Sequence, residues 1–463
     1  MSLAEERQLL AGWGRAGKSA ARLVSPSCTQ EAEKVLAALG NEGGRPAIAR
    51  GLGRSYGDAA QCGGGTVIDC RGLTAPFEIS PSGLCRAGGG LSIDSLLERA
   101  VPAGWFVPVT PGTRQVTVGG AIASDVHGKN HHVDGAFAAH LRRLELVAPT
   151  GRILCGPEDP AFAASCGGMG LTGVITEATF QLIPIESSRI KVETERAGDL
   201  DACMALLAER AEEHRYSVAW VDGLAGGRKL GRSVVTRGDH ARPAELPAGA
   251  AKDPLAYRPR QRFRAPLAPP LSPLSPATIA LMNEVWYRKA PRTSKTSFES
   301  IASFFHPLDA VGDWNLLYGT RGFIQYQYVV PFGAEEVVRD SLERLGRAGH
   351  PPYLVVLKTF GPPGQGHLSF PREGWTLALD LPLGRAGLAE VLDGLDELVA
   401  EAGGRVYLTK DSRLRPELLE QMYPRLPAWR EEARRLDPDG IMSSDLDRRL
   451  GLRRSPEKKA LGK

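Results

Sequence analysis

The sequence has no uninterrupted apolar run of the roughly 18 residues that suggest a membrane span. Its opening residues also lack the basic-then-apolar pattern of a secretory signal. The net charge of +4 is small for 463 residues, so a general nucleic-acid-binding surface is not expected. These absences predict a protein that is cytoplasmic or peripherally membrane-associated and has no nucleic-acid partner.

Cysteine and metal-ligand patterns are also sparse. The seven cysteines lie between Cys28 and Cys203 and include no Cys-x-x-Cys pair. This pattern argues against both a disulfide framework and a zinc ribbon. Free thiols packed as small hydrophobic side chains are expected instead. No metal site is predicted at His127, His131 and His132, because Gly128 interrupts their presentation from one helix face.

The chain is longer than a single core usually supports, so two domains are predicted. Residues 1–186 have the pattern of an α+β region with several glycine-rich loops. After Glu186 the composition changes, and residues 187–404 carry strand-like runs and helical patterns. The strands are expected at 323–330, 353–359 and 375–381, and the helices at 334–347 and 388–401. This layout is typical of an antiparallel sheet covered by helices, which would suit a substrate domain.

Two glycine-rich segments suggest a ligand that lies against main chain. Residues 111–132 combine the Gly119-Gly120 pair and small residues with the protonatable His127 and Lys129, and we predict a flavin beside them. Residues 50–58 follow a short strand at 46–49 and contain three glycines, a serine and two arginines. Such a loop can hold a pyrophosphate through backbone N–H groups, although an ordinary tight turn is equally compatible with it.

A third glycine-rich segment, Gly12 to Ser19, matches both a P-loop and a dinucleotide-binding pattern. Both patterns need a buried strand before the loop, and residues 7–11 are too short and polar to supply one. We therefore interpret this segment as a glycine-rich loop without a nucleotide. A P-loop nucleotide-binding protein remains the alternative from a different functional class.

Several motifs together resemble a known family. Residues 51–58, 111–132 and 170–173 are similar to the FAD-binding half of the vanillyl-alcohol-oxidase superfamily. The likeness extends through 286–289, 305–309, 322–327 and 407–413 to the decaprenylphosphoryl-β-D-ribose 2′-oxidases. It implies a PCMH-type FAD-binding domain at 1–186, the substrate domain at 187–404, and a return of residues 405–463 to the first domain.

The resemblance also implies the reaction and its partners. The expected substrate is a polyprenyl-phosphate sugar, decaprenylphosphoryl-β-D-ribose, whose 2′-hydroxyl is oxidised to a ketone. A separate keto-reductase would complete epimerisation to the arabinose donor for cell-wall polysaccharide, and a quinone would accept the electrons. An aldonolactone- or alditol-type FAD oxidase acting on a small soluble sugar is the alternative within the enzyme class.

The cofactor contacts expected from these loops and this likeness form one set. They are Ala49, Arg50, Gly51, Leu52, Gly53, Arg54, Ser55, Tyr56, Gly57, Asp58, Ala59, Gly112, Thr117, Val118, Gly119, Gly120, Ser124, Asp125, Val126, His127, Ile175 and Tyr407. Members of the superfamily with covalently attached flavin carry histidine where this chain has Arg54. We therefore predict non-covalent FAD.

Lys410 and His127 are the expected catalytic residues. Taken alone, Lys410 is compatible with a surface ion pair to Asp411, but the resemblance places it at the substrate, as base or as oxyanion stabiliser. His127 could move a proton or hydrogen-bond flavin and substrate. The expected substrate contacts are Tyr56, Lys129, Trp220, Gln325, Gln327, Lys358 and Lys410.

Two further features bear on the substrate. Thr376 and Ala378 stand where well-known members have asparagine and cysteine, which leaves the lipid and sugar contacts open. Arg258, Arg260, Arg262 and Arg264 alternate in a proline-rich segment. This segment is compatible with a solvated linker, and also with contact to a polyprenyl phosphate or an anionic membrane surface.

Overall fold

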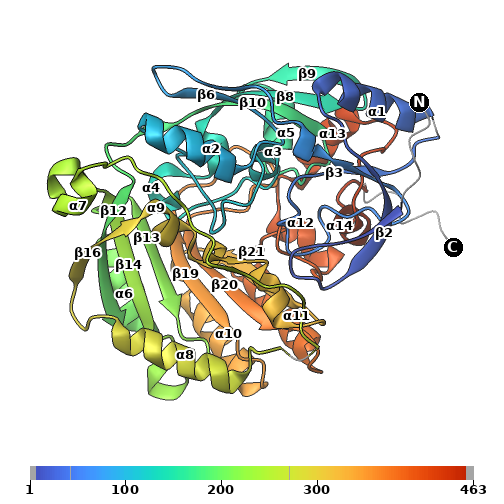
Figure 1. Ribbon diagram of the computed structural model, residues 1–463. Helices are drawn as coiled ribbons and strands as arrows, with labels where there is room; N and C mark the ends of the chain where they lie inside the picture. Colours follow the sequence, from blue (N-terminus) through green and yellow to red (C-terminus); the bar gives the residue numbers. More distant parts are fainter. Residues whose placement is uncertain (1–6, 42, 271, 455–463) are drawn as a thin grey trace.

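The computed structural model describes residues 7–41, 43–270 and 272–454, and the architecture is α+β, as predicted. The first part of the chain builds two sheets (Figure 1). The four-stranded sheet has the order β1 (Arg7–Ala11), β2 (Lys18–Val24), β4 (Thr66–Asp69), β3 (Ala47–Arg50). The five-stranded sheet has the order β5 (Phe77–Ile79), β6 (Leu84–Gly88), β10 (Val174–Gln181), β8 (Leu141–Ala148), β9 (Gly151–Cys155).

The helices of this part begin at recognisable caps and bury one apolar stripe. In α2 (Ile93–Ala100), the Ser92 hydroxyl accepts a hydrogen bond from the Ser95 N–H, and Ile93, Leu96 and Leu97 are buried. The remaining helices here are α1 (Thr29–Asn41), α3 (Val118–Ala123), α4 (His131–Asp134) and α5 (Pro160–Ser165).

The segment from Gly12 to Ser19 is a β-hairpin connection. It joins the antiparallel strands β1 and β2, with Ala11 opposite Lys18, and no helix follows it. A side chain at Gly12 would lie 2.0 Å from the carbonyl oxygen of Gly57, so this glycine permits close packing against the 51–58 loop. The interpretation as a glycine-rich loop is confirmed, and the P-loop alternative lacks its required strand–loop–helix context.

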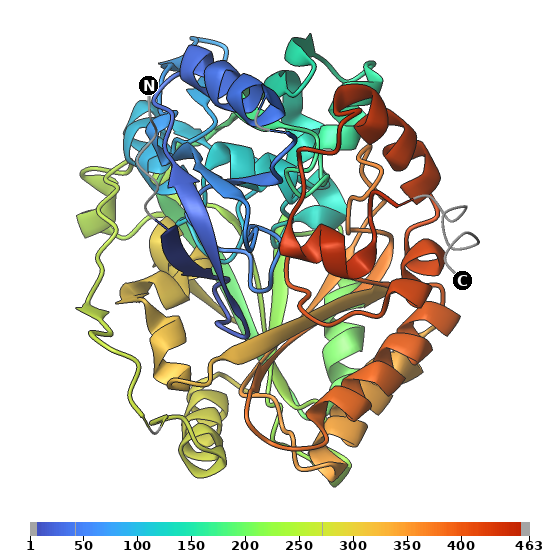
Figure 2. The same ribbon diagram turned by 90° about the vertical axis from the view of Figure 1, so that its right-hand side faces the viewer.

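The second part of the chain is dominated by one antiparallel sheet of eight strands. Its order is β16 (Lys295–Ser300), β12 (Arg189–Ala197), β14 (Ser233–His240), β13 (Tyr216–Val221), β19 (Leu354–Phe360), β20 (Gly374–Pro382), β18 (Phe323–Val330), β21 (Arg405–Val406). One face is covered by α6 (Leu200–Glu209), α10 (Glu335–Arg347) and α11 (Leu388–Glu401), as Figure 2 shows for the last two. The strands and helices predicted between 323 and 401 are all present, within a residue or two of their expected ends.

The final part of the chain bridges both regions. Strand β21 is still paired with β18 of the large sheet, and then α12 (Leu419–Met422), α13 (Leu426–Leu436) and α14 (Asp445–Leu450) lie beside the first part (Figure 2). The indole N–H of Trp429 donates to the carbonyl of Ala164 in α5, at 3.0 Å. The chain thus leaves the first region, builds the large sheet, and returns. Residues 455–463 of the expected returning segment lie outside the described residues.

The peripheral elements include a long connection from 241 to 276. It is not without structure, because α7 (Ala248–Ala251) and β15 (Phe263–Arg264) lie in it, and β15 pairs with β17 (Val311–Gly312). The other small elements are β7 (Trp105–Phe106) paired with β11 (Ile183–Pro184), α8 (Pro276–Lys289) and α9 (Ile301–Phe305). Within the described ranges, the helices are all too short or too polar to cross a membrane.

Candidate active site

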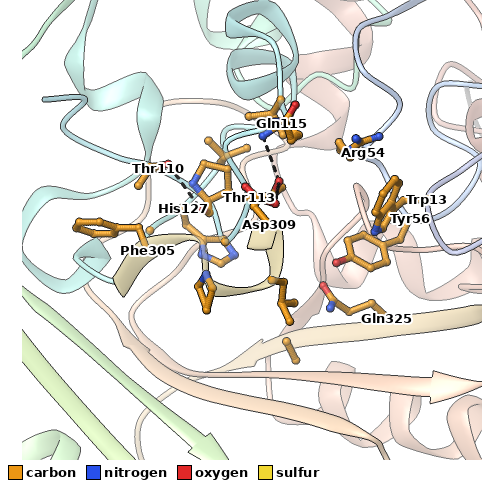
Figure 3. Close-up of a pocket in the computed structure, with 18 of the residues that line it drawn as sticks. Trp13, Arg54, Tyr56, Thr110, Thr113, Gln115, His127, Phe305, Asp309 and Gln325 are labelled. Carbon is orange, nitrogen blue, oxygen red and sulfur yellow. Dashed lines mark hydrogen bonds between the residues drawn. The ribbon is translucent and has the colours of Figure 1, made fainter. Parts of the chain in front are cut away.

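A cavity of about 1100 Å³ lies between the glycine-rich loops of the first part and the uncovered face of the large sheet. The loops contribute residues from 49–60 and 110–129, and the sheet contributes side chains from all its long strands. Figure 3 shows Tyr56 from the first part and Gln325 from the sheet pointing toward one another, with His127 across the cavity. The cavity therefore joins the two predicted sites.

The 51–58 loop has free backbone donors on its cavity side. The amide N–H groups of residues 52–55 have no hydrogen-bond acceptor among the described residues, and Gly53 has a φ of +65°. Successive N–H groups around a left-handed residue form a concave anion site, so this loop fits the pyrophosphate of FAD. Arg50 and Arg54 line the same region and add positive charge, and the Arg54 guanidinium stacks 4.0 Å above the Trp13 ring.

The second glycine-rich segment forms a flat wall. Thr117 caps α3 by accepting from the Gly120 N–H at 3.2 Å, and the Gly119 N–H donates to the carbonyl of Gly89. A side chain at Gly119 would approach that carbonyl oxygen to 3.0 Å, so the helix is held close to the neighbouring loop. The Tyr407 hydroxyl donates to the Ser124 carbonyl, which closes this wall with a ring from the end of the chain. The surface is compatible with a planar isoalloxazine.

Most of the predicted cofactor contacts line the cavity, and four do not. Gly57, Asp58, Val118 and Asp125 are absent from its lining. Val118 is fully buried, Asp58 forms an ion pair with Arg449 at 2.9 Å, and Asp125 accepts from Ser369 and from the Ala138 N–H. The prediction of cofactor contact at these four positions is therefore wrong. They pack behind the loops that line the cavity.

All seven predicted substrate contacts reach the cavity. Gln325 and Gln327 lie two apart on β18 and share the uncovered face, as their spacing predicted. Lys358 and Trp220 reach the same face from β19 and β13, while Tyr56 and Lys129 come from the loops opposite. Strands far apart in the sequence thus assemble one polar cluster.

Lys410 is connected to a buried carboxylate through an amide. Its Nζ donates to Oε1 of Gln325, and Nε2 of Gln325 donates to Oδ1 of Asp380. Burial lowers the pKa of Lys410 to about 8, and the charge of Asp380 opposes this shift. Burial raises the pKa of Asp380 to about 6. Lys410 does not form the surface ion pair with Asp411 that was the alternative from sequence. Asp411 pairs with Arg449 instead, at 2.8 Å.

His127 belongs to a second polar chain. Its Nδ1 lies 3.1 Å from Nζ of Lys358, and its Nε2 lies 3.0 Å from Nε2 of Gln327. The Gln327 amide also donates to Oγ1 of Thr376, at 3.0 Å. Burial and the neighbouring Lys358 hold the pKa of His127 well below its usual value, and burial lowers that of Lys358 to about 7.

Two further polar groups near the cavity are the Gln327 amide oxygen and the Lys129 ammonium. Oε1 of Gln327 is buried and has no hydrogen-bond partner within the described ranges, although other atoms of Gln327 line the cavity. Lys129 donates to the Phe304 carbonyl, and burial lowers its pKa to about 8. Three buried lysines, Lys129, Lys358 and Lys410, therefore line the same cavity, which favours a substrate that carries negative charge.

The three neighbouring histidines point to different partners. His131 accepts at Nδ1 from the Gly361 N–H, and His132 lies 3.1 Å from the carbonyl of His214 through Nε2. His127 faces the cavity. They do not converge on one point, so each acts in its own local contact.

Sequence reasoning missed Asp380. It stands directly opposite Gln325 in the register of β20 with β18, which brings its carboxylate to the amide. Thr376 and Ala378 of the same strand were expected to bear on the substrate, but only the pairing of the two strands reveals the contact of Asp380.

The comparison with known proteins agrees with this geometry. Residues 20–155 match the family model described as FAD binding domain. The decaprenylphosphoryl-beta-D-ribose oxidase of Mycolicibacterium smegmatis is 42% identical over 449 residues, which cover 96% of this chain and 97% of that protein.

More limited similarity extends to a dehydrogenase and an oxidase of other names. The L-gulono-1,4-lactone dehydrogenase of Mycobacterium tuberculosis is 27% identical over 35% of this chain and 38% of its own length. The alditol oxidase of a Streptomyces species is 27% identical over 30% of this chain and 34% of its own length. The first relative, in contrast, matches over nearly the whole of both chains. The chain therefore belongs to the decaprenylphosphoryl-β-D-ribose oxidase family of FAD-dependent oxidoreductases.

Proposed function

We propose that this chain oxidises the 2′-hydroxyl of decaprenylphosphoryl-β-D-ribose to the 2′-keto sugar. The observation that carries the proposal is the buried connection from Lys410 through Gln325 to Asp380, on the floor of the cavity that the FAD loops enclose. The full-length relative of that name supports the choice of substrate. Bound FAD supplies the acceptor for the hydride that leaves the carbinol carbon.

In this proposal, Lys410 takes the proton of the hydroxyl as general base. A base works best when its pKa lies near the working pH, and a lysine with a pKa of about 8 meets that condition where an exposed lysine does not. Gln325 fixes the Nζ atom from one side, because its amide is itself held by Asp380. The carboxylate also stabilises the ammonium that forms when the proton arrives.

The remaining polar groups would orient the sugar. Gln325 and Gln327 line the cavity and can hydrogen-bond ribose hydroxyls, and His127 is kept neutral beside Gln327. Lys129 and Lys358 offer charge to the phosphate. Ala378, which replaces the cysteine of well-known members, lines the cavity with a smaller side chain and enlarges the space next to Gln327.

The proposal also covers partners that act before and after the oxidation. A separate keto-reductase would consume the 2′-keto sugar to give the arabinose epimer. A quinone would reoxidise the cofactor, and the basic segment at 258–264 would favour peripheral association with the membrane that holds both lipids.

A visible spectrum followed by anaerobic substrate addition tests the proposal. Purified holoenzyme should show flavin absorbance that bleaches with prenylphosphoryl ribose but not with free alditols or aldonolactones. The Lys410→Ala variant should retain FAD yet lose the bleaching by about 10²–10⁴-fold in rate, the usual contribution of a positioned base. Bleaching by alditols alone would favour the small-sugar oxidase, and an active Lys410→Ala protein would remove the base from this lysine.

A further inference from the structure

Helix α8 exposes a large apolar side to solvent, while Ile279 and Asn283 on its other side are buried. Leu281, Met282, Val285 and Trp286 expose 67%, 59%, 59% and 53% of their surface. Their spacing of three and four residues places them on one outward side of the helix. Figure 1 shows α8 at the outer edge of the molecule, beyond the large sheet.

The side of α8 that faces the protein is held by polar contacts. The buried Asn283 amide donates to Asp222 at 2.7 Å, and Glu284 forms an ion pair with Arg232 at 2.8 Å. The Tyr287 hydroxyl donates to the Ala197 carbonyl. Because these contacts fix the rotation of the helix, the apolar side chains are directed outward by the fold. A patch of this kind marks a binding surface.

The segment of sequence that contains α8 is strongly basic. Between 258 and 295 the sequence has eight basic residues and one acidic residue, Glu284, which is already paired with Arg232 and Arg288. The basic residues are Arg258, Arg260, Arg262, Arg264, Arg288, Lys289, Arg292 and Lys295, and all are exposed. An apolar helix side flanked by exposed lysine and arginine is the pattern of a helix that lies in the interface of an anionic bilayer.

The cavity reaches this helix. Its floor runs across the sheet from Gln325 through Val356, Val218 and Trp220, and Trp286, Lys289 and Lys295 line it at the exposed end. The intervening lining is largely apolar. The opening beside α8 therefore lies next to the apolar helix side.

We propose that the outward side of α8, defined by Leu281, Met282 and Val285, docks the protein onto an anionic lipid bilayer with the mouth of the cavity facing the membrane. The exposed basic residues at the C-terminal end of α8 and directly after it contact lipid phosphates; they are Arg288, Lys289, Arg292 and Lys295. One part of the inference rests on the proposed function: a polyprenyl chain could remain in the bilayer while its sugar headgroup reaches Lys410. The docking itself does not depend on which sugar is oxidised.

The test is co-sedimentation of the FAD-loaded protein with vesicles. We expect binding to phosphatidylglycerol–phosphatidylcholine vesicles, and little binding to phosphatidylcholine alone. The double variant Leu281→Glu/Val285→Glu should reduce the bound fraction by about tenfold, since two carboxylates oppose burial at an anionic interface. Leu154→Glu is the matched control, because Leu154 is 51% exposed on β9, away from α8, and should bind as the unchanged protein does.

Three outcomes would overturn the proposal: no vesicle binding by the unchanged protein, equal binding by the double variant, or a lipid-free dimer that this variant dissociates. Flavin absorbance and the thermal midpoint show that the double variant is folded. Turnover of a detergent-dispersed, short-chain prenylphosphoryl ribose separates the docking proposal from the proposed function. Docking can fail while this turnover persists. Conversely, vesicle binding without any such turnover would leave docking intact and overturn the proposed function.

Discussion

Nζ of Lys358 lies 3.1 Å from Nδ1 of His127, so two groups that can each carry positive charge share one buried contact. Burial and Lys358 together lower the pKa of His127, which keeps its imidazole neutral near pH 7. A neutral imidazole can offer both a donor and an acceptor to the neighbouring Gln327 and Lys358. The pair therefore behaves as one hydrogen-bonding unit with at most one charge.

Replacing Lys358 should move the titration of His127. In Lys358→Met the neighbouring cation is gone, so the pKa of His127 should rise, although burial still holds it below the usual value. Imidazole nitrogen shifts, followed by NMR as a function of pH, measure this change. Lys129→Met is the control, because Lys129 does not contribute to the lowered pKa of His127, and a shift of equal size there would contradict the assignment.

Asp380→Asn should shift the pH profile of kcat/KM. The carboxylate opposes the lowering of the Lys410 pKa, so its loss should lower that pKa further below about 8. If neutral Lys410 is the base, activity rises as pH increases through this pKa, and the rising limb should move to lower pH in the variant. Asp380→Glu retains the charge and should keep the limb near its original position. A shift to higher pH would contradict the coupling.

FAD should be released by acid precipitation. Arg54 occupies the position at which covalently flavinylated relatives carry histidine, and its guanidinium is stacked on Trp13. Flavin absorbance should therefore be recovered in the supernatant, and the precipitated protein should be colourless. Yellow protein after acid treatment would mean that another residue forms a covalent bond.

Gly57→Ala should destabilise the protein. The added methyl group would lie 1.7 Å from the carbonyl oxygen of Asp411, a contact that only backbone movement can relieve. We expect a loss of about 1–3 kcal/mol, the range for overpacking, seen as a lower midpoint of unfolding. Gly198→Ala is the control, because no atom lies within 4 Å of the added carbon, and its midpoint should change little.

The reactivity of the cysteines should follow their burial. Cys28 is exposed and the other six thiols are buried, with the pKa of Cys62 raised by burial to about 11 and that of Cys85 to about 12. A thiol reagent such as Ellman's should therefore label one cysteine in the native protein and seven after denaturation. The Cys28→Ser variant should show no rapid labelling in the native state. More than one fast thiol in the unchanged protein would contradict this burial pattern.

The parts of the site that sequence could predict are those built from contiguous residues. The glycines and arginines of the 51–58 loop predict hydrogen-bond donors for a ligand. The small residues of the 111–132 segment predict a surface on which a ligand can lie. The spacing of Gln325 and Gln327 alone predicts that both side chains lie on the same face of the sheet. In each case the local pattern carries the information.

What sequence could not predict depends on pairing between distant strands and on the rotation of a helix. Asp380 reaches Gln325 because β20 and β18 pair in one particular register. The exposed side of α8 contradicts the usual expectation that Leu281 and Val285 face a core, and only contacts of Asn283 and Glu284 reveal its orientation. The residues after α14 are likewise fixed by a contact distant in sequence, because Arg453 donates to the Leu171 carbonyl.

The return of the chain has a consequence for its synthesis. The Tyr56 N–H donates to the carbonyl of Thr409, and Trp429 completes the packing on α5, so the first region needs residues that are synthesised after the large sheet. Domains usually fold in order as they emerge, but here the N-terminal region must wait for residues that follow the large sheet. Translation therefore delivers the large sheet before either the loop site or Lys410 is complete, and a nascent chain truncated before residue 405 would lack the means to hold its cofactor loops in place.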